Sequence, residues 1–149
     1  TYINKGLESG AKLVAGGNRL GGGLAHGLFV EPTIFDDVNQ HAAIFQEEIF
    51  GPVLSITTFD TVDDAVRLAN DSPFGLAAGV WSSNIETAIS VSKRILSGTV
   101  WINAYYDAGL PFVMPMGGYK GSGIGRELGR EGLDQYYETK AVHIRLEQG

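Results

Sequence analysis

Residues 53–103 read VLSITTFDTVDDAVRLANDSPFGLAAGVWSSNIETAISVSKRILSGTVWIN, and this stretch alternates short apolar runs with amphipathic segments. The apolar runs are rich in β-branched and aromatic side chains, which favour strands. The segments between them place apolar side chains at the three- and four-residue spacing of a helix. We therefore expect strands at residues 53–59, 76–81 and 99–103, with helices over residues 62–69 and 85–96.

Capping residues stand where each of these helices should begin. Thr61 is followed three residues later by Asp64, and Ser83 by Glu86, which is the spacing of a capping box. One helix between consecutive strands predicts crossover connections. The predicted fold class is therefore α/β, with a mainly parallel sheet and crossover helices; an α+β domain with antiparallel strands is the alternative.

The two ends of the chain carry further regular patterns. A helix is expected over residues 2–11, and because the chain starts at Thr1 without Met, we expect it to be a piece of a longer protein. At the other end, Val142, Ile144 and Leu146 alternate with polar residues, which predicts a strand with one apolar face. A terminal strand of this kind can pair with a second chain.

Composition excludes several classes of function. The net charge of −6 leaves no basic footprint for nucleic acid, and no apolar run is long enough to predict a membrane helix. With no cysteine, the 149 residues hold neither disulfides nor a thiolate nucleophile, and the three histidines are scattered without metal-ligand spacing. We expect a cytoplasmic protein that binds no metal, no nucleic acid and no membrane.

The first motif that suggests a binding site is Glu47-Glu48-Ile49-Phe50-Gly51-Pro52-Val53. The Gly-Pro pair predicts a sharp bend just before a strand. A carboxylate at such a bend can accept hydrogen bonds from both hydroxyls of a vicinal diol, while an aromatic ring covers a flat heterocycle. That geometry suits a nucleotide ribose. In the alternative interpretation, both carboxylates are merely solvated and Phe50 belongs to the core.

The second motif lies in residues 114–127, MPMGGYKGSGIGRE, where many of the 21 glycines gather. Glycines permit positive φ and close approach of backbones, and they lead into a segment at residues 126–137 that has helical character. The spacing differs from the Gly-x-Gly-x-x-Gly fingerprint of dinucleotide-binding domains. A ligand site and a flexible loop remain equally good interpretations.

Taken together with Trp101-Ile102-Asn103, the two motifs resemble the C-terminal part of the NAD(P)-dependent aldehyde dehydrogenase superfamily. The resemblance runs nearly end to end and keeps the family's order and spacing. It covers residues 27–33, 47–53, 70–78, 98–103 and 117–129.

The resemblance implies roles for individual residues. Glu48 matches the family's glutamate that holds the nicotinamide ribose, and Phe50 matches the aromatic residue near the nicotinamide. Five further residues are implied to line the substrate tunnel: Asn103, Tyr105, Tyr106, Phe112 and Met116. The implied organisation is a part of the catalytic domain at residues 1–119, a glycine-rich connector and helix at residues 120–139, and an oligomerisation strand at residues 140–149.

The implied activity is oxidation of a small aldehyde to a carboxylic acid by NAD or NADP, through a thiohemiacetal and an acyl-thioester on a cysteine. That cysteine and the general-base glutamate lie upstream of this chain in the family, so the chain contains no catalytic residue and should be inactive alone. The choice between NAD and NADP belongs to the missing part. The motif Met-Pro-Met-Gly-Gly-Tyr-Lys at residues 114–120 is similar to the betaine-aldehyde and amino-aldehyde branch, and the candidates for a cation–π site beside it are Trp101, Tyr105, Tyr106 and Phe112.

A second class of function stays open beside the enzyme. The chain can be a non-enzymatic assembly or remnant module that acts through subunit contact. In both cases a homo-oligomer through residues Val142 to Leu146 is expected.

Overall fold

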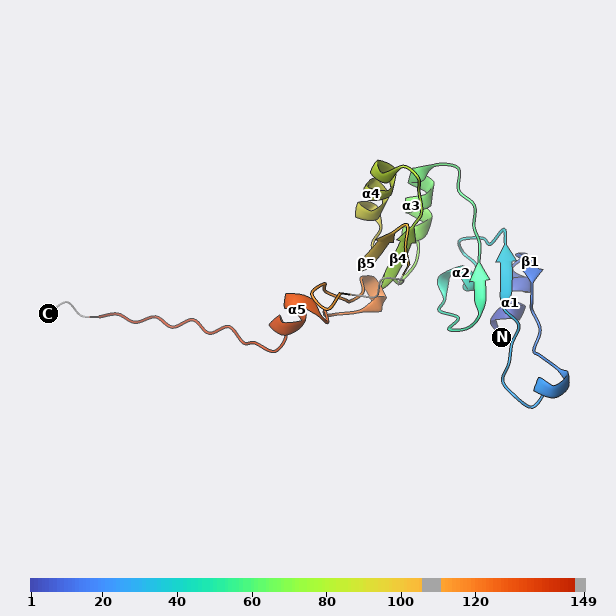
Figure 1. The fold of residues 1–149 in the computed structure, drawn as a ribbon, viewed down its shortest axis with the longest axis horizontal. Coiled ribbons are helices and arrows are strands. Elements are labelled where there is room, and N and C mark those ends of the chain that lie inside the picture. Colours follow the sequence, from blue (N-terminus) through green and yellow to red (C-terminus); the bar gives the residue numbers. More distant parts are fainter. Residues whose placement is uncertain (106–110, 147–149) are drawn as a thin grey trace. The chain divides into compact units, whose positions relative to one another are not determined.

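The computed structural model describes residues 1–105 and 111–146. The chain divides into two compact units, Thr1–Pro73 and Phe74–Gly149, each of which is described by itself (Figure 1).

The first unit is built around a three-stranded sheet in the order β1-β2-β3. Strands β1 and β2 are antiparallel, whereas β2 and β3 are parallel, with Thr33 opposite Val53. The parallel pairing agrees with the predicted fold class, and the antiparallel pair makes this sheet mixed. The elements are α1 (Tyr2–Glu8), β1 (Lys12–Ala15), η1 (Gly22–Leu24), β2 (Thr33–Asp36), α2 (Ala43–Gln46), β3 (Val53–Ser55) and α3 (Val62–Asn70).

The core of this unit is centred on Phe35, which is fully buried in β2. Gly6 of α1 lies directly over it, since a β-carbon at that position would come within 2.7 Å of the Phe35 ring. The absence of a side chain at Gly6 thus lets the helix pack closely on the sheet. The other buried members of this cluster are Ala11, Val38, Ala42 and Ile44.

Helix α3 begins as its capping residues predict. The Thr61 hydroxyl accepts a hydrogen bond from the backbone N–H of Asp64 at 3.1 Å and donates one to the Asp64 carboxylate at 2.7 Å. The bond from Thr61 is the main reason that the pKa of Asp64 lies below its usual value. The predicted capping box at this helix is therefore confirmed.

The second unit contains two parallel strands, β4 (Ala77–Val80) and β5 (Thr99–Ile102), joined by α4 (Ile85–Arg94). This is one of the two crossover connections expected from the sequence. The other, from residues 53–59 to residues 76–81, is wrong, because β3 pairs with β2 and β4 pairs with β5 in a separate sheet. The prediction of Ser83 as the cap of α4 is wrong: Asn84 is the N-cap, and its side chain accepts from the N–H of Thr87 at 3.0 Å. The next elements along the chain are η2 (Lys120–Ser122) and α5 (Gly129–Asp134).

The glycine-rich segment packs at the amino ends of β4 and β5. The Gly75 carbonyl oxygen accepts hydrogen bonds from the N–H groups of Gly98 at 3.0 Å and Tyr119 at 2.8 Å. A β-carbon on Gly98 would overlap the carbonyl oxygen of Gly117, so the two backbones touch. This segment is not an open loop, because Gly117 touches Gly98 and Gly118 lies against Ser122, whereas the ligand site remains a prediction.

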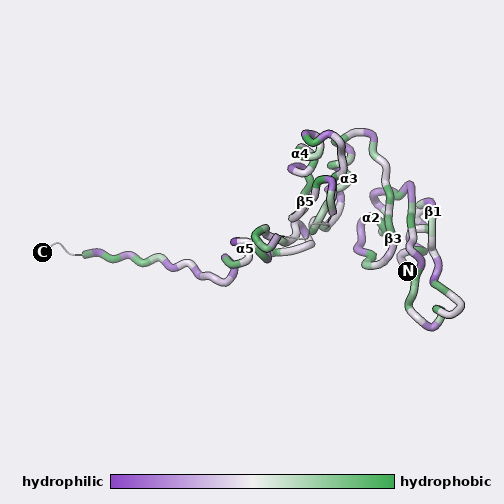
Figure 2. Tube along the Cα trace, in the orientation of Figure 1, coloured by the Kyte–Doolittle hydropathy of each residue, from purple (hydrophilic) through white to green (hydrophobic). Residues whose placement is uncertain are grey.

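The end of the chain differs from the expected strand. Residues 140–146 form neither helix nor strand, and Val142, Ile144 and Leu146 are exposed. Figure 2 shows hydrophobic and hydrophilic residues alternating along this segment. A strand needs a neighbour for its backbone hydrogen bonds. The oligomerisation strand therefore remains a prediction about a second chain.

None of the helices in the described residues combines the length and the hydropathy needed to cross a bilayer.

Candidate functional site

The bend at residues 47–52 is held at both of its ends. On one side, the Glu47 N–H donates to the carbonyl of Ala43 at 2.8 Å, which closes the last turn of α2. On the other, the Pro52 carbonyl accepts from the N–H of Thr33 at 2.8 Å, which joins the bend to β2. Phe50, between these anchors, has φ of 50°, in the left-handed region that side-chain-bearing residues rarely adopt. Non-glycine residues in this region gather at functional sites.

The two adjacent glutamates of the bend have different surroundings. The Oε2 atom of Glu47 accepts hydrogen bonds from the Tyr2 hydroxyl at 2.9 Å and the Lys5 ammonium at 2.8 Å, both on α1. The bond from Lys5 contributes most to a pKa of Glu47 below its ordinary value, and the bond to Glu47 raises the pKa of Tyr2. Glu47 is therefore an ionised carboxylate whose two hydrogen-bond donors both lie on α1.

Glu48 and Phe50 instead face solvent. The Glu48 carboxylate is exposed and has no hydrogen-bond partner within residues 1–105 and 111–146, and the Phe50 ring is 94% exposed. The alternative interpretation of Phe50 as a core residue is therefore wrong. An unpaired carboxylate offers two acceptor oxygens, which can bind both hydroxyls of a vicinal diol, while a bare ring offers a flat apolar face. This bend can thus bind a ribose and its heterocycle.

A second group of predicted residues lies at the carboxyl ends of β4 and β5. Asn103 follows β5 with φ of 52°. Its side-chain oxygen accepts from the Ser82 N–H at 2.9 Å, and its side-chain nitrogen donates to the Ser82 carbonyl at 3.0 Å. The Asn103 amide thereby adds two hydrogen bonds, both to the backbone of Ser82, at the end of the β4–β5 ladder. Both of its polar atoms bind backbone, so Asn103 sets the direction of the chain that follows.

We expect Asn103→Ala to destabilise the second unit by about 2 kcal/mol, because two hydrogen bonds are lost and alanine is strained at positive φ. Asn103→Gly loses the same bonds without that strain, so it should recover about 1 kcal/mol. Urea unfolding of the three proteins measures both differences. Equal stability of the wild type and the Ala variant would contradict this role.

Aromatic rings gather beside Asn103. The Tyr105 ring lies 5.1 Å from the ring of Trp101 in β5 and 6.4 Å from that of Trp81, which follows β4. Tyr105 and Trp81 remain 50% and 63% exposed, so their faces are accessible. Such faces attract cations as well as flat apolar groups.

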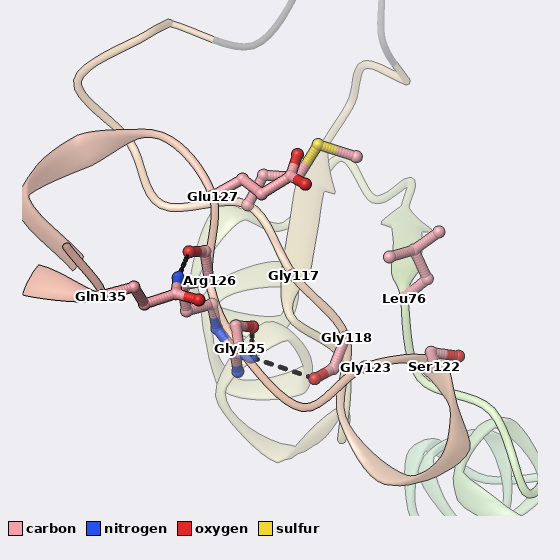
Figure 3. Close-up of a pocket in the computed structure, with 10 residues that line it drawn as sticks. Leu76, Gly117, Gly118, Ser122, Gly123, Gly125, Arg126, Glu127 and Gln135 are labelled. Carbon is pink, nitrogen blue, oxygen red and sulfur yellow. Dashed lines mark hydrogen bonds between the residues drawn. The ribbon is translucent and has the colours of Figure 1, made fainter. Parts of the chain in front are cut away.

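The other predicted tunnel residues are distributed differently. Met116 pairs its backbone with Glu127 and lines a hollow of about 360 Å³, in which Arg126 donates to the carbonyl oxygens of Gly118 and Gly125 (Figure 3). Phe112 is 84% exposed, and its carbonyl accepts from the Gly129 N–H at 2.9 Å. Tyr106 lies outside the described residues. The structure therefore joins Tyr105 to the Asn103 region and Met116 to the glycine-rich segment.

Sequence reasoning missed three neighbours of these residues. Tyr2 and Lys5 lie 45 and 42 positions from Glu47, so no local pattern could have joined them. Trp81 was visible as an aromatic residue at a strand end, a place where α/β proteins often bind ligands. No three histidine or acidic side chains among the described residues come together as metal ligands.

A model described as the aldehyde dehydrogenase family matches residues 1–142. The chain is 50% identical to an aldehyde dehydrogenase of Alternaria alternata, over 97% of this chain and 28% of that protein. It is 48% identical to a betaine aldehyde dehydrogenase of Bacillus subtilis, over 95% of this chain and 29% of that protein. The crystal structure of a Mycobacterium tuberculosis aldehyde dehydrogenase complexed with NAD+ superimposes with a TM-score of 0.89 at 46% identity, covering 99% of this chain and 30% of that one. The chain thus spans less than a third of the length of these relatives.

Proposed function

Since the chain belongs to the aldehyde dehydrogenase family, we propose that it supplies cofactor-binding and substrate-lining parts of an enzyme that oxidises an aldehyde to a carboxylic acid. The observation that carries this proposal is the anchored bend with an exposed Glu48 and Phe50. A carboxylate without a protein partner beside an uncovered ring has the chemistry to bind a nicotinamide nucleoside.

The residues of the bend fit NAD or NADP equally, because both cofactors carry the same nicotinamide ribose. When bound, the cofactor accepts a hydride from the substrate. In this proposal the Glu48 carboxylate accepts hydrogen bonds from the two ribose hydroxyls and Phe50 lies near the nicotinamide ring. Together they orient the nicotinamide, and placement within about 1 Å decides the rate of such a transfer.

The chain itself carries no cysteine, so the nucleophile of the proposed reaction must come from residues outside it. The same holds for the general base that activates water, which the family resemblance assigns to an upstream glutamate. We accordingly propose that the 149 residues have no dehydrogenase activity on their own.

The substrate in this proposal is a small aldehyde, bound on the side of the chain that carries Asn103 and Tyr105. The ring faces of Tyr105 and Trp81 support a cationic aldehyde, because exposed rings attract quaternary ammonium groups. The similarity to a Bacillus subtilis betaine aldehyde dehydrogenase supports the same class.

A chimera tests the proposed function. This chain replaces the matching 145 residues of the Alternaria alternata enzyme, and NADH formation from an aldehyde is followed by absorbance. We expect the chimera to reduce NAD+ and the chain alone to give no signal above a blank. A folded chimera that binds no NAD+, as judged by calorimetry, would contradict the proposal.

The same chimera tests the substrate class. Betaine aldehyde is compared with an uncharged aldehyde of equal size, before and after Tyr105→Leu. Since cation–π attraction is about 1 kcal/mol at an exposed site, we expect the substitution to lower kcat/KM for the cation about fivefold more than for the neutral aldehyde. Equal losses of kcat/KM for the two aldehydes would contradict a cationic substrate.

The alternative function, subunit contact by a non-enzymatic module, is favoured by one observation: the alternating apolar residues at 142–146 are exposed. If the module assembles through them, analytical ultracentrifugation of the chain should show a dimer or larger species that Ile144→Asp converts to a monomer. A monomer at all concentrations would exclude this assembly.

A further inference from the structure

We propose that Lys5, Tyr2 and Glu47 form a positioning clamp that holds the bend so that Glu48 and Phe50 face the cofactor. The clamp consists of two donors on α1 and one acceptor oxygen at the end of α2. This inference rests on the proposed function of Glu48 and adds residues that do not themselves touch the cofactor.

The geometry of the clamp is specific to one oxygen atom. The Lys5 ammonium and the Tyr2 hydroxyl both bind Oε2 of Glu47, at 2.8 and 2.9 Å. The same ammonium lies 4.6 Å from the centre of the Tyr2 ring, so the two donors also support each other. Glu47 therefore cannot turn its side chain away from α1 without losing two bonds at once.

The clamp acts directly next to the residue that it would orient. Glu47 immediately precedes Glu48, and a peptide link transmits the direction of one residue to the next through only two soft dihedral angles. The helix behind it is tied as well: the Ser55 hydroxyl donates to the Ile44 carbonyl at 2.8 Å, and the Gln46 amide donates to the Gln40 carbonyl at 2.7 Å.

The opposite end of the bend is fixed by the sheet. Pro52 is joined to β2 by its bond from Thr33, and the Val53 N–H donates to the Gly51 carbonyl at 2.8 Å. Glu48 and Phe50 are therefore exposed residues that lie between two anchored ends. Removing the clamp takes the side-chain bonds from one of these ends, while the backbone bond from Glu47 to Ala43 and the anchor at Pro52 stay in place.

The first experiment measures motion in the chain itself. Backbone ¹⁵N order parameters at Glu48 and Phe50 are compared between the wild type and Lys5→Met. We expect them to fall from about 0.85 toward 0.6, the range of flexible backbone, while those of β4 and β5 stay unchanged. Unchanged order parameters at the bend would overturn the clamp.

The second experiment measures cofactor use in the chimera. Lys5→Met and Glu47→Gln should each raise KM for NAD+ about threefold, the effect of one exposed charge-assisted hydrogen bond. The KM for the aldehyde should stay the same. Lys5→Arg should have the wild-type KM for NAD+, because arginine keeps a donor for Glu47. Glu8→Gln is the matched control, since Glu8 is an exposed carboxylate on the same helix.

A further control tests whether a general loss of stability also raises the KM for NAD+. Val38→Ala removes buried volume from the core of the same unit, so it lowers the melting temperature while the two hydrogen bonds to Glu47 keep their donors and acceptor. Its KM for NAD+ should equal that of the wild type. A rise in the KM for NAD+ in Val38→Ala as large as in Lys5→Met would overturn the clamp. A KM for NAD+ in Lys5→Arg as high as in Lys5→Met would also overturn it.

The failure of the clamp can be told apart from the failure of the proposed function. If Glu48→Gln impairs hydride transfer while Lys5→Met and Glu47→Gln leave the KM for NAD+ unchanged, the clamp alone is overturned. If Glu48→Gln also leaves hydride transfer unchanged, the bend does not bind the cofactor, and both the proposed function of Glu48 and the clamp are contradicted.

Discussion

Glu48→Gln in the chimera should slow hydride transfer about a hundredfold, because a nicotinamide whose ribose is held less firmly is misplaced relative to the substrate. The amide keeps the size of the side chain but loses one acceptor oxygen and the negative charge. Pre-steady-state NADH formation measures the step directly. With a deuterated aldehyde, the isotope effect should increase as hydride transfer becomes rate-limiting.

Two controls define this result. Glu8→Gln, the same chemical change on α1, should leave the rate unchanged. Glu48→Asp keeps the charge but shortens its reach, so its rate should lie between those of the wild type and Glu48→Gln. A Glu48→Gln chimera with the wild-type rate and the wild-type affinity for NAD+ would mean that Glu48 does not bind the cofactor.

Gly98→Ala should destabilise the second unit by about 3 kcal/mol, at the upper end of the range for overpacked sites. A methyl group there overlaps the Gly117 carbonyl oxygen, and backbone cannot rotate away as a side chain can. The strain should also weaken the hydrogen bond from Gly98 to Gly75. Urea unfolding followed by the fluorescence of Trp81 and Trp101, both in this unit, measures the loss.

Gly23→Ala is the matched control for this substitution. Gly23 lies in η1, and a β-carbon there would meet nothing within 4 Å. Because Gly23 lies in the first unit, the unfolding of this control is followed by circular dichroism of the whole chain. Its stability should change by less than about 0.5 kcal/mol, as for an ordinary surface substitution. If Gly98→Ala is as stable as Gly23→Ala, the close contact of Gly98 and Gly117 does not exist in solution.

The helices and the strands β3, β4 and β5 were predictable because their signals are local, whereas the pairing of β3 with β2 rather than with β4 was not. Thr61 and Asp64 lie one turn apart, so the start of α3 could be read directly. The predicted strand at residues 53–59 is longer than β3, which ends at Ser55. The cap of α4 was misplaced by one residue, because Ser83 and Asn84 are both good caps and only the register of the helix chooses between them.

The candidate site was predictable only in part. A carboxylate and a ring beside Gly51-Pro52 predicted a bend but left Phe50 open between a ligand site and the core, and the structure has both side chains in solvent. The clamp could not be foreseen, since it joins residues more than forty positions apart. The packing of the glycine-rich segment was equally hidden, because glycine spacing is the same in a flexible loop, a ligand cradle and a close backbone contact.

The shared carbonyl of Gly75 has a consequence for synthesis on the ribosome. Its two donors, Gly98 and Tyr119, emerge 23 and 44 residues after it, and the Ser122 hydroxyl that accepts from the Gly75 N–H emerges later still. The backbone groups of Gly75, two residues before β4, therefore meet these partners only after this distant turn has been translated. Ribosome-bound chains that stop before Tyr119 should consequently be cut by protease near Gly75, and longer ones should resist.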